Sequence, residues 1–274
     1  MRGMFTAGVI DVWMEHGITF DGAIGVSAGA TFGCNLKSLQ PGRTIRYNKR
    51  YCRDWRYCSF RSLLVTGDLY GREFCYDELP KKLDPFDTDT FMNNPMRFYV
   101  VATDVETGEA VYKETKKGTG LDMEWFRASA SMPVLSRPVL IGGRGYLDGG
   151  CTDSIPVKYF ESIGYEKNIV LLTQPKGYRK NEKNPLMPAL KALLHKYPAL
   201  QDAMEHRAER YNETVRELEK RQKEGDENLL VIYPPEELNI GKMEKNPDEL
   251  ERVYRIGRRT AERMLDQVRE FLEK

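Results

Sequence analysis

The sequence predicts an α/β protein that ends in a mostly helical part. Short apolar runs alternate with segments of helical periodicity up to about residue 175, a pattern typical of a sheet covered by helices. Beyond that point, charged helical segments dominate. Because no internal repeat or low-complexity tract interrupts the 274 residues, we expect one domain, with residues 1–175 as its α/β part and residues 176–274 as a helical extension packed on it.

The first third of the chain predicts a helix, a strand and further helices, in that order. Apolar residues at helical spacing indicate a helix over 4–16, and Gly17 is a typical residue for its end. A short strand follows at about 18–25, and a second helix covers 28–39. The segment 43–64, which is rich in Arg, Tyr and Cys, predicts a further helix with a mixed face.

Turn residues predict two hairpins in the middle of the chain. The first pairs residues 98–104 with 109–114, and the second pairs 139–141 with 145–148 around Gly142-Gly143. The remaining expected elements are a helix near 156–164, a strand over 168–172, a basic surface loop over 176–184, a mostly helical stretch over 186–224 interrupted near Pro198, a strand over 229–233 and a helix from about 247 to 272.

Composition and charge exclude several classes of protein. Lys and Arg total 42 and Asp and Glu total 41, so the net charge of +1 offers no basic excess for binding nucleic acid. No apolar run approaches the roughly 18–20 residues that cross a bilayer. A hydrophobic fraction of 41% excludes a wholly disordered chain. The first residues also lack the long apolar core of a signal peptide.

The five cysteines are an odd number and show no spacing that suits zinc. The sequence contains neither a Cys-x-x-Cys pair nor a neighbouring Cys/His cluster, so we expect no structural metal. The simplest interpretation is a reduced, cytoplasmic protein with free thiols.

One pentapeptide carries the pattern of a nucleophilic serine. Gly25-Val26-Ser27-Ala28-Gly29 reads G-x-S-x-G and lies between a predicted strand and a predicted helix. A serine on such a strained turn projects its hydroxyl, and glycines allow the close backbone approach that the turn requires. The amides that open the helix, starting with Ala28, are able to stabilise a negative oxygen. The alternative is a Gly/Ala-rich turn with an incidental serine.

A carboxylate suits the role of base for Ser27 better than a histidine does. An ordinary α/β-hydrolase places several strands before its serine, whereas only 26 residues precede Ser27. His195 and His206 fall in the late charged helices, where a solvated or packing role is expected. Asp148, which ends a predicted strand before Gly149-Gly150, is the best candidate among 41 acidic residues. The alternative is an aspartate that only caps a turn.

Together these motifs resemble the patatin-like phospholipase family. G-x-S-x-G matches Gly25 to Gly29, and the family's D-G-[GA] motif matches Asp148-Gly149-Gly150. The segment 128–133 resembles the one that precedes D-G-[GA], and Met1-Arg2-Gly3 matches the tail of the oxyanion loop G-G-G-x-R-G. The resemblance implies a three-layer α/β/α fold with a mostly parallel central sheet. It also implies a serine acyl hydrolase with Ser27 as nucleophile and Asp148 as proton acceptor.

The resemblance implies an oxyanion site as well, formed by Arg2, Gly3 and Ala28. In the family, a strand and three glycines come before this point, and they would precede Met1. Burying a strand's side chains contributes about 1.5–3 kcal/mol each, comparable in sum to the net stability of a domain. We therefore expect the natural protein to be longer.

The first functional hypothesis is a lipid acyl hydrolase without a metal or organic cofactor. Its substrate would be a lipid or another acyl ester, and its contact with a membrane surface would be transient. Residues 43–61 interleave basic and aromatic side chains, as suits a headgroup surface, although a solvated helix packed by its aromatic residues explains the pattern equally well. The alternatives are a non-catalytic lipid- or protein-binding module that retains the fold, and an esterase that depends on His195.

Overall fold

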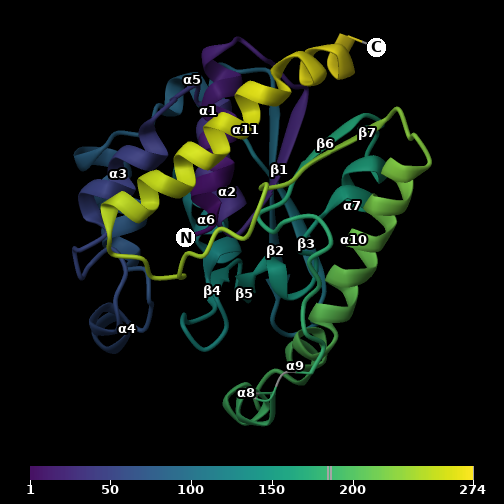
Figure 1. Ribbon diagram of the computed structural model, residues 1–274. Helices are drawn as coiled ribbons and strands as arrows, with labels where there is room; N and C mark the ends of the chain where they lie inside the picture. The colour runs from purple at the N-terminus through teal and green to yellow at the C-terminus, as the bar shows by residue number, and fades with distance from the viewer. Residues whose placement is uncertain (184, 186, 274) are drawn as a thin grey trace.

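The computed structural model describes residues 1–183, 185 and 187–273, and it shows strands with helices on both sides (Figure 1). The strands are β1 (Gly22–Val26), β2 (Arg97–Asp104), β3 (Ala110–Thr115), β4 (Val139–Ile141), β5 (Arg144–Asp148), β6 (Asn168–Leu171) and β7 (Leu229–Ile232). The helices are α1 (Gly3–Glu15), α2 (Ala28–Lys37), α3 (Arg43–Tyr51), α4 (Phe60–Thr66), the π-helix η1 (Phe74–Leu83), α5 (Thr88–Asn93), α6 (Leu121–Ala130), the 3-10 helix η2 (Gly149–Cys151), α7 (Val157–Ser162), α8 (Met187–Leu193), α9 (Pro198–Glu205), α10 (Arg207–Lys223) and α11 (Pro247–Glu273). The predicted α/β class with a helical C-terminal part is confirmed.

The central sheet is mixed, which corrects the expectation of a mostly parallel one. Its order is β1-β2-β5-β4, with β3 also on β2, and only the β1–β2 pair is parallel among the pairs that the described residues form in it. The reason is the length of the connections. Five residues join β2 to β3 and two glycines join β4 to β5, whereas a parallel crossover needs about a dozen residues or more.

The side chains of β2 define the two helical layers. Phe98 packs its ring against Phe91 of α5 and Phe126 of α6. The next residue, Tyr99, points to the opposite face and packs against Phe160 of α7. Because successive side chains of a strand face opposite sides, this pair of contacts places α5 and α6 on one face and α7 on the other. Figure 1 shows the same separation, with α1, α2 and α6 on one side and α7 and α10 on the other.

A second, parallel sheet consists of β6 and β7. In the part of the chain that the structure describes, β1 and β6 each pair with one strand, so each leaves its other edge without a partner strand. Residues of both strands line the same cavity.

Helix α1 is buried over nearly its whole length, and the long C-terminal helix α11 packs along it (Figure 1). Helix α1 ends at Glu15, and Gly17 just beyond it adopts a positive φ of 66°, as predicted for a residue that terminates a helix. The buried Asp11 joins three elements, since Oδ2 accepts hydrogen bonds from the Gly42 amide at 2.9 Å and the Tyr254 hydroxyl at 2.7 Å. These contacts hold the second half of α1 against α11 and the start of α3.

The segment 43–64 forms two helices rather than the single helix expected. Helix α3 ends at Tyr51, and α4 begins after Ser59, whose hydroxyl accepts a hydrogen bond from the Ser62 amide at 2.9 Å. Between them the Asp54 carboxylate accepts from the amide of Arg56 at 2.9 Å and closes a turn. Side chain–backbone bonds of this kind compete with helix and interrupt it.

The later elements follow the predicted order. Both hairpins and the strand β6 are present, and Pro198 stands at the first position of α9, where its missing N–H costs nothing. Residues 176–183 of the expected surface loop lie outside helices and strands. Residues 184 and 186, which belong to the predicted loop and helical stretch, lie outside the described residues.

Candidate active site

Ser27 stands on a strained turn between β1 and α2. Its backbone has φ 55° and ψ −120°, a conformation that is rare for any residue with a side chain. The turn is tight enough that a Cβ atom on Gly25 would lie 2.3 Å from the carbonyl oxygen of Gly29. The Ser27 amide donates to Ser129 Oγ at 3.0 Å, which holds the turn against α6. Backbone strain of this kind is typical of functional residues.

Asp148 lies at the end of β5 and meets Ser27. Ser27 Oγ donates a hydrogen bond of 2.6 Å to Asp148 Oδ2, while the Gly150 amide donates to Oδ1 at 2.7 Å. The backbone of Asp148 is fixed as well, since its amide donates to the Ser131 carbonyl at 2.7 Å and its carbonyl accepts from Thr103 Oγ1 at 2.9 Å. The structure thus brings together the two residues that the sequence singled out from opposite ends of the α/β part.

Burial controls the proton affinity of Asp148. The carboxylate is buried beneath the turn, and this desolvation raises the pKa of Asp148, against the smaller opposing effects of its hydrogen bonds from Ser27 and Gly150. A carboxylate with a raised pKa is a stronger base than an ordinary one, and a dry site strengthens its interaction with a nearby proton. The geometry and the electrostatics of the pair therefore suit proton transfer.

Two helix N-termini meet beside Ser27. Gly3 and Ala28 are the first residues of α1 and α2, and a Cβ on Gly3 would lie 2.7 Å from the Cβ of Ala28. The first amides of a helix have no partner within it and carry the positive end of the helix dipole. These amides are therefore oriented to bind an anion. Arg2 precedes them with an exposed side chain that borders the same cavity.

The glycines of the two motifs differ in how closely other atoms approach the position of a Cβ atom. A Cβ on Gly149 would lie 2.3 Å from the carbonyl oxygen of Val101, so Gly149 permits β2 to pass closely. A Cβ on Gly29 would meet nothing within 4 Å, so the small size of Gly29 is not required by contacts in this structure. Gly150 opens toward a polar region of the cavity next to Asp148.

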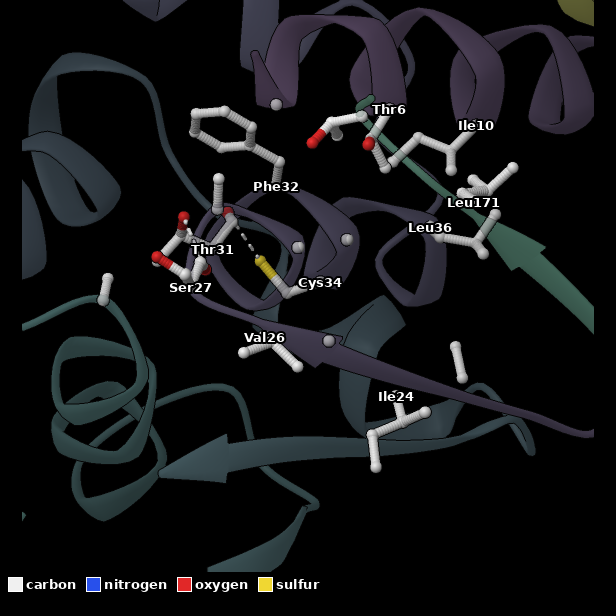
Figure 2. Close-up of a pocket in the computed structure, with 18 of the residues that line it drawn as sticks. Thr6, Ile10, Ile24, Val26, Ser27, Thr31, Phe32, Cys34, Leu36 and Leu171 are labelled. Atoms are coloured by element: carbon white, nitrogen blue, oxygen red, sulfur yellow. Dashed lines mark hydrogen bonds between the residues drawn. The ribbon is translucent and has the colours of Figure 1, made fainter. Parts of the chain in front are cut away.

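A cavity of about 1520 Å³ extends from Ser27 into the protein. Figure 2 shows part of its wall, which is mostly apolar, with Ile24 and Val26 from β1, Ile10 and the polar Thr6 from α1, Phe32 and Leu36 from α2, and Leu171 from β6. Ser27 lies near one end of this group. An apolar cavity that leads away from a serine hydroxyl has the volume and the lining to enclose a hydrocarbon chain.

The histidines lie elsewhere. None of the three is among the described residues that line the cavity. His195 and His206 are exposed, and each places Nδ1 near a carbonyl oxygen of its own helical segment, at 3.1 and 3.0 Å. The described residues contain no group of three or more His, Cys, Asp or Glu side chains that would hold a metal ion. No described helix is both long and apolar enough to span a bilayer.

The segment 43–61 combines buried aromatic residues with basic side chains that are mostly exposed. Arg43 is buried and donates to the Asp84 carbonyl, and Arg46 forms an ion pair of 2.7 Å with the Asp84 carboxylate. Tyr47 and Tyr57 are buried with their rings in contact. Packing therefore accounts for Arg43, Tyr47 and Tyr57, while the other basic side chains lie at the surface.

Sequence reasoning missed several residues that build the site. Thr103 and Ser129 hold the backbone around the pair; no motif marks Thr103, and Ser129 lies in the segment 128–133 but was given no role. Lys180 and Arg207 border the cavity from a loop and from the first residue of α10, in parts of the sequence without a recognised motif. For Lys180 the available signal was the basic character of the loop 176–184.

The fold and the site define an α/β protein with a serine at a strand-to-helix turn and a buried aspartate beside it. The chain belongs to the patatin-like phospholipase family, a family of lipid hydrolases, whose model matches residues 1–161. Residues 197–273 match a further family described as a domain of unknown function, DUF6363.

Similar proteins extend over different parts of the chain. The Escherichia coli (strain K12) protein named "Uncharacterized protein YjjU" is 27% identical over 273 residues, covering 94% of this chain and 72% of its own length. "Lysophospholipase NTE1" of Debaryomyces hansenii is 28% identical over 169 residues, which are 60% of this chain and 10% of that protein. The NTE1 protein of Meyerozyma guilliermondii is also 28% identical, with 60% and 11% covered. The similarity thus spans about a tenth of each NTE1 protein.

Proposed function

We propose that this protein is a serine acyl hydrolase of the lysophospholipase or phospholipase type that uses Ser27 and Asp148 as a dyad. The observation that carries the proposal is the 2.6 Å hydrogen bond between Ser27 Oγ and a buried aspartate, on a turn with a positive φ. Membership of a lipid hydrolase family and similarity to proteins named lysophospholipase support the same substrate class.

The reaction has two steps. Ser27 Oγ attacks the ester carbonyl carbon while its proton moves to Asp148 Oδ2. The amides of Gly3 and Ala28, with Arg2 adjoining them, stabilise the oxyanion that forms. The C–O bond to the alcohol then breaks and the alcohol leaves with the proton from Asp148. Water, deprotonated by the same carboxylate, releases the fatty acid and restores the Ser27 hydroxyl.

Hydrolysis of a chromogenic acyl ester tests this assignment. Wild-type protein should release the chromophore, and Ser27→Ala should abolish the release while the protein stays folded. Ser162→Ala, a change of an exposed serine on α7, is the matched control and should retain full activity. A Ser27→Ala variant with wild-type turnover would exclude Ser27 as the nucleophile, and an inactive wild type would favour the non-catalytic binding module. A requirement for His195 would favour the histidine-dependent esterase.

Transient contact with a membrane surface is part of the same proposal, and α4 is the surface that suits it. Phe60, Leu64 and Val65 are 60%, 87% and 66% exposed. The segment after α4 is hydrogen-bonded to a residue that lines the cavity, since the Leu69 amide donates to the carbonyl oxygen of Leu135 at 2.8 Å. The fraction of protein that sediments with lipid vesicles should therefore be smaller for a Leu64→Asp variant than for Met92→Asp. Met92, on α5, is also exposed and serves as the control.

A further inference from the structure

A polar region borders the cavity next to Asp148, and Gly150 marks its position. A Cβ atom on Gly150 would lie 3.0 Å from Asp148 Oδ1, 3.5 Å from Arg207 Nη2 and 3.6 Å from Ser154 Oγ. A carboxylate, a guanidinium and a hydroxyl therefore surround one point in front of the glycine. The absence of a side chain at Gly150 keeps this point open to the cavity.

Arg207 is held with its guanidinium toward this point. Its Nε donates to the Gly150 carbonyl oxygen, so the arginine is attached to the backbone of the D-G-G motif itself. This bond uses one of the five N–H groups of the guanidinium, and it leaves Nη2 near the open point in front of Gly150. Arg207 is the first residue of α10, and its backbone is therefore positioned by a helix of 17 residues.

Lys180 reaches the same region from the loop that precedes α8. Its Nζ donates to Ser154 Oγ at 3.4 Å and lies 3.9 Å from the centre of the Tyr211 ring. The loop backbone is fixed, because the Lys180 amide donates to Asn212 Oδ1 at 2.8 Å and the Lys180 carbonyl accepts from Asn212 Nδ2 at 2.9 Å. The ammonium is thus placed by several contacts on α10.

Arg207 and Lys180 differ from their neighbours in their ion pairing. Within the described part of the chain, no carboxylate oxygen lies within ion-pair distance of either cation, whereas the adjacent Arg179 pairs with Glu219. Burial, followed by the charges of Arg207 and Arg2, lowers the pKa of Lys180 to about 7. The nearby carboxylate of Asp148 opposes this effect only in part, so a bound anion would lower the remaining cost of placing two cations here.

We propose that Arg207 and Lys180 form a phosphate-binding subsite that recognises the headgroup of a phospholipid or lysophospholipid whose ester lies at Ser27. The inference rests on the proposed function for the position of the ester. Phosphate fits the chemistry, because guanidinium and ammonium groups bind its oxygens through charge-assisted hydrogen bonds, and Ser154 supplies a hydroxyl donor. The proposed subsite lies next to Asp148, so its ligand must carry the phosphate close to the ester that Ser27 attacks. A glycerophospholipid does so, because only a few bonds separate its phosphate from the ester carbonyl.

The subsite assigns a role to the C-terminal part of the chain. The match to the patatin-like family ends at residue 161, and both cations lie beyond it. Arg207 falls in the region that matches the domain of unknown function. On this proposal, the N-terminal part supplies the groups that react, and the C-terminal part distinguishes a phosphate-bearing ester from a neutral acylglycerol.

A pair of substrates with the same acyl chain tests the proposal. The measured quantity is kcat/KM for lysophosphatidylglycerol divided by kcat/KM for monoacylglycerol. Arg207→Gln and Lys180→Gln should each lower this ratio by about 10- to 100-fold, as expected for loss of a charged hydrogen bond. Arg216→Gln, on an exposed part of α10, is the control and should leave the ratio unchanged. An unchanged ratio in both cavity variants would overturn the subsite.

A binding measurement that needs no catalysis separates this inference from the proposed function. In a Ser27→Ala background, dodecyl phosphate should bind at least about tenfold more tightly than 1-O-dodecylglycerol, and Arg207→Gln or Lys180→Gln should remove that preference. This result would support the subsite even if the wild type hydrolysed no ester. Equal binding of the two amphiphiles would refute it. If inorganic phosphate bound as tightly as dodecyl phosphate and depended on the same residues, the site would serve free phosphate rather than a lipid headgroup.

Discussion

Gly8 of α1 and Gly257 of α11 each lie against the backbone of the other helix. A Cβ on Gly8 would be 2.1 Å from the carbonyl oxygen of Tyr254, and a Cβ on Gly257 would be 2.1 Å from that of Phe5. Because neither glycine has a side chain, the two helices approach closely near the start of α1, the helix whose first residue lies beside Ser27. The C-terminal helix thereby supports the position of the site.

The first prediction concerns this helix contact. Gly257→Ala should lower the free energy of unfolding by at least about 1–3 kcal/mol, because the added methyl group forces two buried backbones apart. Gly241→Ala is the control, since a Cβ there meets nothing within 4 Å. Chemical denaturation of both variants measures the difference. Equal stability of the two would show that the helices separate at no cost.

The second prediction compares the two glycines of the serine motif. Gly25→Ala should lower Tm and activity, because its Cβ would lie 2.3 Å from the Gly29 carbonyl oxygen and the turn has no room to move. Gly29→Ala should keep or raise Tm, since its Cβ position is open and alanine favours helix. Thermal melts of the two variants measure both Tm values. A higher Tm for Gly25→Ala than for Gly29→Ala would contradict the steric restriction at Gly25.

The third prediction concerns the base. Asp148→Asn keeps the shape of the side chain and its acceptor for the Gly150 amide, but it removes the proton acceptor for Ser27. Ester hydrolysis should fall by about 10²–10⁴-fold. Asp202→Asn, an exposed aspartate on α9, should be fully active. Steady-state kinetics on a soluble ester measure both, and near-normal turnover in folded Asp148→Asn would place the base elsewhere.

The fourth prediction follows from the raised pKa of Asp148. Folding raises this pKa, so the folded protein holds the proton more tightly than the unfolded chain does, and the ionised carboxylate destabilises the fold at neutral pH. Asp148→Asn should therefore raise Tm relative to the wild type at about pH 7. The gain should shrink as the pH falls through the raised pKa toward the ordinary aspartate value of about 3.9. Melts across this range test the sign, and a difference independent of pH would contradict it.

The sequence predicted the positions of the elements better than their pairing. Local signals sufficed for the helix end at Gly17 and for both hairpins, because turn residues act on their immediate neighbours. Whether paired strands run parallel or antiparallel depends on which strands pair, and the pairing follows from the short connections taken together. The break between α3 and α4 was missed because Ser59 and Asp54 act through side chain–backbone bonds that apolar periodicity does not reveal.

The site was predictable where motifs marked it. Ser27 and Asp148 stand in glycine-rich sequences that a tight turn requires, and the structure places their side chains 2.6 Å apart. Arg207 and Lys180 were not predictable, because each is an ordinary residue in a charged segment until the fold brings it to Gly150. Similarly, the burial of Arg43 depends on Asp84, which is distant in sequence, so the basic pattern of residues 43–61 did not reveal which of its cations lies inside the protein.

The unpartnered edge of β1 has a consequence for amide exchange with solvent deuterium. In a parallel strand, the N–H groups of alternate residues point to opposite sides, so one set along Gly22–Val26 bonds to β2 and the other faces the cavity. Exchange rates should therefore alternate from residue to residue along β1, and the same should hold along β6 beside β7. In β2, which has partners on both sides where it meets β3 and β5, successive amides from Ala102 to Asp104 should be protected alike.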